Sequence, residues 1–126
     1  MPLTRISLRR GRSQEDCKQI MEQIYLAMRE TFDVPENDRF MMLHEHDAHQ
    51  FDFGTTYLDI PRTDALVIIQ ITANGTRSTD QKKALFAGIC ERLTKSPGLR
   101  PEDVFVSLVE VKKENWSFGH GLAQYA

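Results

Sequence analysis

The fold of this chain is decided by a stretch that occurs twice. Residues 11–18 read Gly-Arg-Ser-Gln-Glu-Asp-Cys-Lys, and residues 76–83, 65 positions later, read Thr-Arg-Ser-Thr-Asp-Gln-Lys-Lys. At the same offset Asp38 aligns with Asp103, and the matches keep one order over about half of the chain. Matches in a constant order at a fixed period are typical of an internal duplication. We therefore predict that the chain consists of two similar units.

The length of the chain sets the size of these units. A chain of 126 residues supports one compact domain. We predict a single domain over residues 1–126, with units of about residues 1–62 and 63–126. Units of this size are too small to bury a full core alone, so the two are expected to fold together.

The composition excludes several classes of protein. Hydrophobic residues make up 40% of the chain and charged residues 27%, which is typical of a globular protein. The formal net charge of −2 lacks the basic excess of nucleic-acid-binding domains, and no apolar run is long enough to cross a membrane. Cys17 and Cys90 form no disulfide framework, and the N-terminus has no apolar secretory signal. We expect a cytoplasmic protein without nucleic-acid or membrane partners.

Each unit reads as strand, helix, strand. Ser13 and Ser78 are favourable helix N-caps, and apolar residues follow both at helical spacing. Pro35 and Pro97 are expected to end the two helices. The predicted strands are residues 3–8, 39–44, 65–72 and 104–111, and residues 46–63 form the connection. The apolar stripe of the second helix comprises Leu85, Phe86, Ile89 and Leu93.

This order of elements predicts an α/β (α+β) fold. Two tandem βαβ units form a four-stranded sheet with two helices on one face. Residues 66–69 and 104–106 are nevertheless apolar on both faces, as in strands that are buried on both sides. Because two helices cover only one face, we expect another copy of the chain to cover the second face. A closed ring is the usual form of such a homo-oligomer.

The second residue is a candidate for proton-transfer chemistry. A small residue after the initiator commonly permits removal of Met1, which would leave Pro2 as the N-terminus. A free proline nitrogen is a secondary amine that titrates, and a partly desolvated pocket lowers its pKa. Such an amine acts as a general base when neutral and as a general acid when protonated. If Met1 is retained, Pro2 is an ordinary amide and this chemistry is lost.

Two charged residues stand beside predicted element ends. Arg77 follows the third strand and precedes the Ser78 cap, where a guanidinium can hold a carboxylate in a bidentate manner. The alternative is an ordinary surface arginine. Asp38 precedes the second strand, where it either orients a water or carbonyl group or serves as a turn residue.

Other residues offer weaker signals. Trp116 and Phe118 follow the last strand, where aromatic side chains either build pocket walls or seal a subunit interface. His44 and His46 share one face of a strand, with His49 in the following loop. No second pair of ligands completes a zinc pattern, so we predict no metal site.

Together these segments resemble the tautomerase superfamily, most closely its malonate semialdehyde decarboxylase branch. The resemblance covers essentially the whole chain and is carried by Pro2, Gly11-Arg12-Ser13, Val34-Pro35-Glu36-Asn37-Asp38-Arg39-Phe40, Arg77-Ser78 and Asn115-Trp116-Ser117-Phe118-Gly119. It implies a tautomerase-like fold, a homotrimer, and an enzyme without a cofactor that acts on a small oxo acid.

The resemblance also assigns roles to individual residues. It implies that Pro2 is the catalytic general acid or base, that Asp38 assists it, and that Arg77 binds the substrate carboxylate. Trp116, Phe118 and Tyr125 are the aromatic residues that it places in the substrate pocket. The reaction implied is keto–enol tautomerisation, decarboxylation of a 3-oxo acid similar to malonate semialdehyde, or both.

One position departs from the pattern of the branch. The decarboxylases carry two arginines one residue apart before the second helix, whereas this chain has Gly75 in place of the first. The departure leaves one carboxylate anchor unassigned and puts decarboxylation in question. Two alternatives therefore stay open: a non-catalytic trimeric binding protein with this fold, and a hydratase or dehalogenase of an unsaturated acid.

Overall fold

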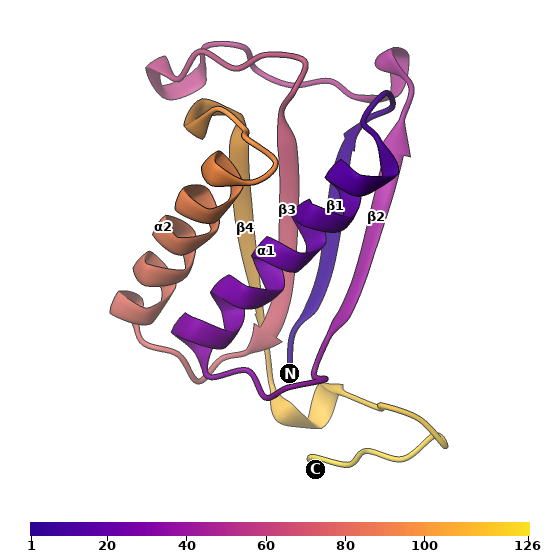
Figure 1. The fold of residues 1–126 in the computed structure, drawn as a ribbon. Coiled ribbons are helices and arrows are strands. Elements are labelled where there is room, and N and C mark those ends of the chain that lie inside the picture. The colour runs from indigo at the N-terminus through magenta and orange to yellow at the C-terminus, as the bar shows by residue number, and fades with distance from the viewer.

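The computed structural model describes residues 1–126 as a mixed four-stranded sheet packed against two helices (Figure 1). The strands are β1 (Leu3–Arg9), β2 (Phe40–His46), β3 (Val67–Asn74) and β4 (Val104–Val111). Their order is β2-β1-β3-β4, with β1 parallel to β2, β3 parallel to β4, and β1 antiparallel to β3. The starts of β1 and β2 therefore lie at the same end of the sheet as the ends of β3 and β4.

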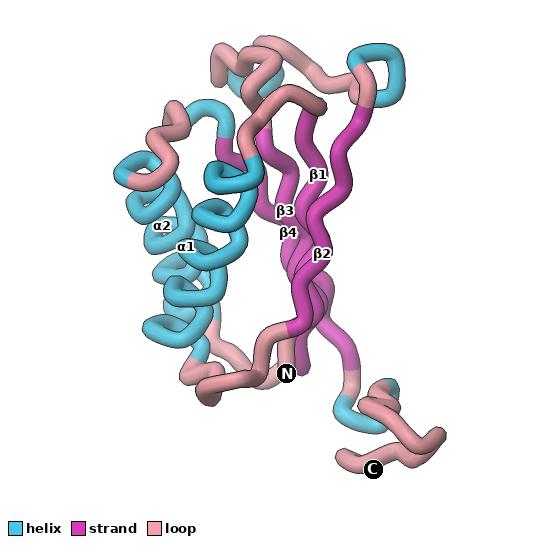
Figure 2. The backbone as a smooth tube through the Cα atoms, turned by 45° about the vertical axis from the view of Figure 1, so that its right-hand side comes forward, coloured by secondary structure: helices cyan, strands magenta, loops and turns pink.

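Both helices cover the same face of the sheet (Figure 2). They are α1 (Gln14–Phe32) and α2 (Thr79–Lys95). The predicted serines cap them: Ser13 Oγ accepts a hydrogen bond from the backbone N–H of Asp16, and Ser78 Oγ accepts one from that of Gln81. The predicted fold class, two tandem βαβ units with two helices on one face, is confirmed.

The core lies between the sheet and the helices. Alternate side chains of β1 and β3, such as Ile6 and Ile69, are fully buried and face the helices. They meet fully buried residues of the helices, such as Ile24 and Ile89. Each such side chain stabilises the fold by about 1.5–3 kcal/mol relative to an exposed one.

The structure differs from the sequence-based expectations in its details. Strands β2 and β3 both continue two residues beyond the predicted ends. Phe86 was predicted in the buried stripe of α2, but its side chain is 37% exposed, so this prediction is wrong. It follows Leu85 directly, and one residue corresponds to a rotation of about 100° around a helix, which turns Phe86 away from the sheet.

The second face of the sheet carries no element of this chain. Phe40 is 52% exposed and Phe105 is 44% exposed, although both belong to strands. A single copy of the chain therefore buries only one face of the sheet. Neither helix combines the length and the apolar character that a membrane crossing requires.

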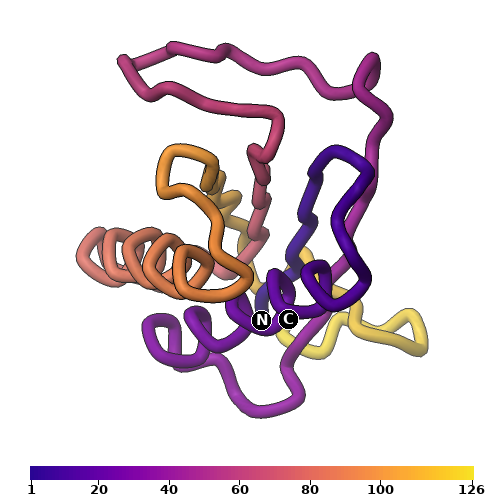
Figure 3. Tube along the Cα trace, turned by 45° about the horizontal axis from the view of Figure 1, so that its top comes forward, coloured from indigo at the N-terminus to yellow at the C-terminus, as the bar shows by residue number.

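The two ends of the sheet are finished by different segments. The connection between β2 and β3, residues 47–66, crosses one end of the sheet (Figure 3) and contains two short 3₁₀ turns, Ala48–Gln50 and Tyr57–Asp59. The tail after β4, residues 112–126, extends past the other end, where β1 starts. This second end holds the candidate site.

Candidate active site

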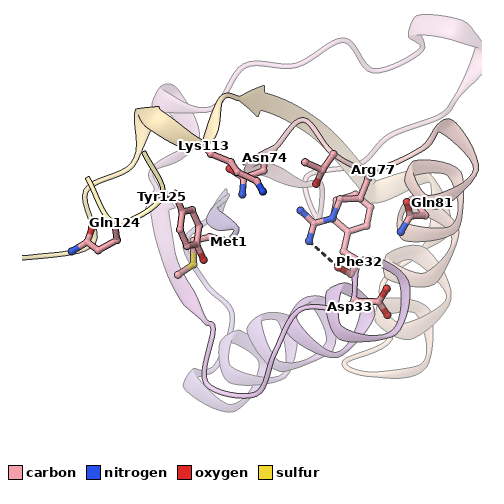
Figure 4. A pocket seen from close by; sticks show the side chains of 10 residues that line it. Met1, Phe32, Asp33, Asn74, Arg77, Gln81, Lys113, Gln124 and Tyr125 are labelled. Atoms are coloured by element: carbon pink, nitrogen blue, oxygen red, sulfur yellow. Dashed lines mark hydrogen bonds between the residues drawn. The ribbon is translucent and has the colours of Figure 1, made fainter. Parts of the chain in front are cut away.

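A cavity of about 740 Å³ lies at the end of the sheet where the chain starts. It is lined by residues of four segments: Met1, the end of α1, the turn between β3 and α2, and the C-terminal tail (Figure 4). The lining is mostly polar and includes the side chains of Arg77, Asn74 and Lys113. Such a lining suits a small, charged and hydrophilic molecule.

Arg77 is held in place by the end of helix α1. Its Nη2 donates a hydrogen bond of 2.8 Å to the carbonyl oxygen of Phe32, and the guanidinium carbon lies 4.8 Å from the centroid of the Phe32 ring. A cation is favourable there because the last carbonyl groups of a helix are unpaired and carry partial negative charge. A guanidinium has five N–H donors, so most of them stay free for an anion in the cavity.

Asp38 lies beside the terminal amine. Its Oδ2 is 3.9 Å from the α-amino nitrogen of Met1, and its side chain is only 12% exposed. The other oxygen, Oδ1, is buried without a hydrogen-bond partner in the protein. Burial raises the pKa of this carboxyl group, while the terminal amine and Arg77 act in the opposite direction.

The same surroundings act on the amine. Burial lowers the pKa of the Met1 amino group; Asp38 raises it, and Arg77 lowers it further. The place occupied by the terminal amine thus favours a neutral amine more than open water does. A neutral amine is the form that can accept a proton.

A smaller apolar cavity of about 200 Å³ adjoins Pro2. Pro2 is buried, and Phe40, Trp116 and Phe118 line the same cavity. Met1 lines both cavities, so its side chain and backbone stand between the polar space at Arg77 and the apolar space at Pro2. Removal of Met1 would join the two spaces and place the proline nitrogen at the junction.

The aromatic residues of the tail form one stacked group. The rings of Trp116 and Phe118 are stacked with centroids 5.5 Å apart, and Tyr125 meets Phe118 edge-on at 4.9 Å. The indole Nε1 of Trp116 donates a 2.7 Å hydrogen bond to Oδ1 of Asn74, which ties the tail to the end of β3. Tyr125 itself lines the larger cavity.

The structure brings the predicted residues to one end of the sheet. Asp38 and Arg77 lie near the terminal amine. The other four predicted residues line the two adjoining cavities: Pro2, Trp116, Phe118 and Tyr125. Sequence reasoning missed Phe32, Asn74 and Lys113. No local signal distinguishes Asn74 from a turn residue, and Phe32 reads as an ordinary core residue.

Other sequence candidates lie elsewhere. His44 and His46 belong to β2, and no group of three His, Cys, Asp or Glu side chains could hold a metal ion. A β-carbon at Gly75 would meet Oε2 of Glu110 at 2.9 Å, and that carboxylate pairs with Lys82. A larger residue at position 75 thus requires Glu110 to move.

Comparisons with known proteins agree with this arrangement. A family model described as tautomerase enzyme matches residues 38–119, and another with the same description matches residues 2–59. The protein named probable tautomerase YusQ of Bacillus subtilis is 40% identical over 98% of both chains. The protein named probable tautomerase YrdN, of the same organism, is 35% identical over 99% of this chain and 96% of its own.

Solved structures with the same fold include enzymes of this kind. A malonate semialdehyde decarboxylase studied for its decarboxylase and hydratase activities superposes with a TM-score of 0.92. It is 31% identical, and the match covers 98% of this chain and 95% of that chain. A fused 4-OT, 18% identical with a TM-score of 0.79 over 95% and 94% of the two chains, shares the fold.

Proposed function

Because the chain belongs to the tautomerase family, we propose that it is a cofactor-independent enzyme whose Pro2 transfers a proton on a small oxo acid. The proposal requires removal of Met1, which turns the proline nitrogen into a free secondary amine. The observation that carries it is the position of the terminal amine: its nitrogen lies 3.9 Å from Asp38, and Met1 lines the same cavity as Arg77.

Arg77 binds the carboxylate of the substrate in this proposal. Its position on the Phe32 carbonyl fixes the guanidinium before substrate arrives, so little side-chain freedom is lost on binding. The anchored acid then extends toward the terminal amine and the aromatic residues of the tail. Asp38 lies 3.9 Å from the α-amino nitrogen of Met1 and raises its pKa; in this proposal it acts in the same way on the Pro2 amine of the mature chain.

Tautomerisation uses the neutral amine as a base. Pro2 takes the proton from the enol oxygen, and the electron pair of that O–H bond forms the carbonyl group. The electron pair of the carbon–carbon double bond then forms a C–H bond with a proton. The protonated Pro2 returns that proton, so the amine ends in its starting state. No metal or cofactor takes part in these steps.

Decarboxylation uses the same amine in its protonated form. The proton of Pro2 polarises the carbonyl group of a 3-oxo acid while the carbon–carbon bond to the carboxylate breaks and carbon dioxide leaves. The electron pair of that bond forms the double bond of an enol, whose oxygen has taken the proton of Pro2. The enol then takes a proton at carbon, and its O–H proton returns to Pro2. The similarity to malonate semialdehyde decarboxylase supports this reaction.

Hydration of an unsaturated acid is a second candidate. The similar malonate semialdehyde decarboxylase is described with a hydratase activity, and Oδ1 of Asp38 has no protein partner. A water molecule bound there could be deprotonated for attack on an unsaturated carbon. A non-catalytic binding protein is the third candidate, and the experiment below separates it from the tautomerase and the decarboxylase.

We also propose a homotrimer. The open face of the sheet exposes Phe40 and Phe105, and isolated proteins rarely leave such aromatic side chains uncovered on a strand. Three copies in a ring would cover this face. Sedimentation equilibrium checks the assembly, and a stable monomer at micromolar concentration would contradict it.

The decisive experiment compares two substrates and two proteins. Intact mass spectrometry first establishes whether Met1 is removed, because a retained methionine leaves Pro2 as an amide. Turnover of phenylenolpyruvate and of malonate semialdehyde is then measured for the natural chain and for Pro2→Ala. Proline-dependent turnover of either acid supports the enzyme; binding of oxo acids without turnover supports the binding protein.

A further inference from the structure

The cavity of about 740 Å³ that Arg77 lines, called the main cavity below, has a second cationic residue. The sequence comparison of arginines does not predict this residue. Lys113 is the second residue after β4 and lines the same cavity as Arg77, from the side of the tail (Figure 4). Its ammonium group has no ion pair and no hydrogen bond in the structure, whereas Lys82 and Lys95 both pair with glutamates. An unpaired ammonium group that lines a polar cavity is available to an anion.

Asn74 strengthens this side of the cavity. It is only 8% exposed, and its Oδ1 accepts the hydrogen bond of the Trp116 indole. Because an indole N–H only donates, this contact fixes the orientation of the amide and leaves its NH₂ group for another partner. No protein acceptor takes that group, and Asn74 lines the cavity next to Lys113 in Figure 4. The ammonium group of Lys113 and the NH₂ group of Asn74 thus provide two kinds of hydrogen-bond donor on the same side of the cavity.

Gly75 lies close to this side of the cavity but supplies no side chain to it. Gly75 faces a neighbouring cavity that shares Asn74, Thr76 and Lys113 with the main one. Glu110 lies within 2.9 Å of where a β-carbon at position 75 would stand, and Lys113 lines both cavities. The carboxylate Asp33 also lines the main cavity, and it does so together with Phe32 and Arg77 at the end of α1.

We propose that Lys113 and the amide of Asn74 bind a second carboxylate, so that the substrate of this enzyme is a dicarboxylic oxo acid. Arg77 holds one carboxylate at the α1 side, and Lys113 with Asn74 holds the other at the tail side. The proposal rests on the proposed function for the reaction that follows, but the binding of two carboxylates is measured without any turnover.

The test compares acids that differ in one carboxylate. Malonate, succinate and glutarate are titrated against propionate, butyrate and valerate, which have the same numbers of carbon atoms, by calorimetry or NMR at low ionic strength. The natural chain is expected to bind at least one dicarboxylate more tightly than its partner. In Lys113→Met this preference should fall about fivefold, the upper range for a partly exposed ion pair.

Lys112→Met is the matched control. Lys112 precedes Lys113, is also exposed, and lines only the neighbouring cavity, so its removal changes the net charge equally without touching the main cavity. It should keep the natural preference. Asn74→Asp, which retains an acceptor for Trp116 and replaces the donors by a negative charge, should lose the preference as Lys113→Met does.

Two results would overturn the proposal. One is a natural chain that binds the monocarboxylates as tightly as the dicarboxylates. The other is an equal loss of preference in Lys112→Met and Lys113→Met, which would assign the effect to the overall charge. Failure of the proton-transfer proposal has a different signature, which is unchanged turnover in Pro2→Ala, so the two failures are distinguishable.

Discussion

The two ends of the sheet carry the same kinds of residue and use them in opposite ways. At the proline end, which contains Pro2, Asp38 and Arg77, Arg77 lines a cavity of about 740 Å³ and Asp38 lies beside the terminal amine. At the loop end, which contains the aligned residues Arg12 and Asp103, the connection between β2 and β3 supplies their partners. Arg12 donates a 2.9 Å hydrogen bond to the carbonyl oxygen of Ala65 there.

The two aspartates show the difference most clearly. Asp103 is completely buried, and its two oxygens accept hydrogen bonds from the backbone N–H and the hydroxyl group of Thr63, at 2.8 and 2.6 Å. Asp38 has one oxygen near the terminal amine and the other without a protein partner. Of the two aligned aspartates, Asp103 is thus fully hydrogen-bonded by the protein, whereas Asp38 keeps one oxygen without a protein partner.

Removal of the proline amine should cause the largest change. Pro2→Ala in the mature chain should lower kcat at least about 100-fold, the usual range for a general acid or base. The fold should be retained, because only the first residue of the mature chain changes, and circular dichroism checks this. Natural activity in Pro2→Ala would mean that the proline end is no more reactive than the loop end.

The arginines offer the next comparison. Arg77→Ala should lower kcat/KM for carboxylate substrates by about 10- to 100-fold, since a charge-assisted contact to the substrate is lost. Arg12→Ala removes the aligned guanidinium at the loop end and should leave kcat/KM unchanged. Equal effects of the two substitutions on kcat/KM would remove Arg77 from the site.

For the free energy of unfolding, the substitution at the loop end should have the larger effect. Asp103→Ala removes the fully buried carboxylate that accepts two hydrogen bonds from Thr63, and the loss of these charge-assisted bonds should reduce the free energy of unfolding by about 2 kcal/mol. Asp38→Ala should cost less, because burial already disfavours the charged form of Asp38. Urea denaturation of both variants measures the difference. A larger loss in Asp38→Ala would show that the aspartate of the proline end is the structural one.

A pH profile gives the smallest and most specific effect. Burial lowers the pKa of the Met1 α-amino group and Asp38 raises it, and we expect the same two influences on the Pro2 amine once Met1 is removed. Tautomerase activity should therefore rise with pH as the amine becomes neutral, with a midpoint below that of an ordinary α-amino group. Asp38→Asn removes the raising influence, so the midpoint should move to lower pH; Asp103→Asn should not move it. Decarboxylase activity should show the mirror image and fall as pH rises.

Much of the fold was predictable from the sequence because its determinants are local. Serine caps, apolar stripes and strand alternation act within one element, and they predicted both helices and all four strands. The antiparallel pairing of β1 with β3 depends on contacts between the units and was not predicted. Phe86 was misplaced because an apolar residue next to a helical stripe looks like part of it.

The site was predictable only where a residue type carries its own chemistry. Pro2, Asp38 and Arg77 stand out as an amine precursor, an acid and a guanidinium. Lys113 did not, because one more lysine after a strand has no signature until the turn of the tail brings it to the cavity. The role assigned to each residue remains a prediction until the variants above are measured.

Met1 and Tyr125 line the same cavity although they stand at opposite ends of the sequence. This has a practical consequence for the production of the protein. An affinity tag fused to the first residue would keep the proline nitrogen in an amide bond. A tag fused to the last residue would lie next to the residues of the tail that line the cavity. The harmless place for a label is the exposed connection around residues 55–58, at the far end of the sheet.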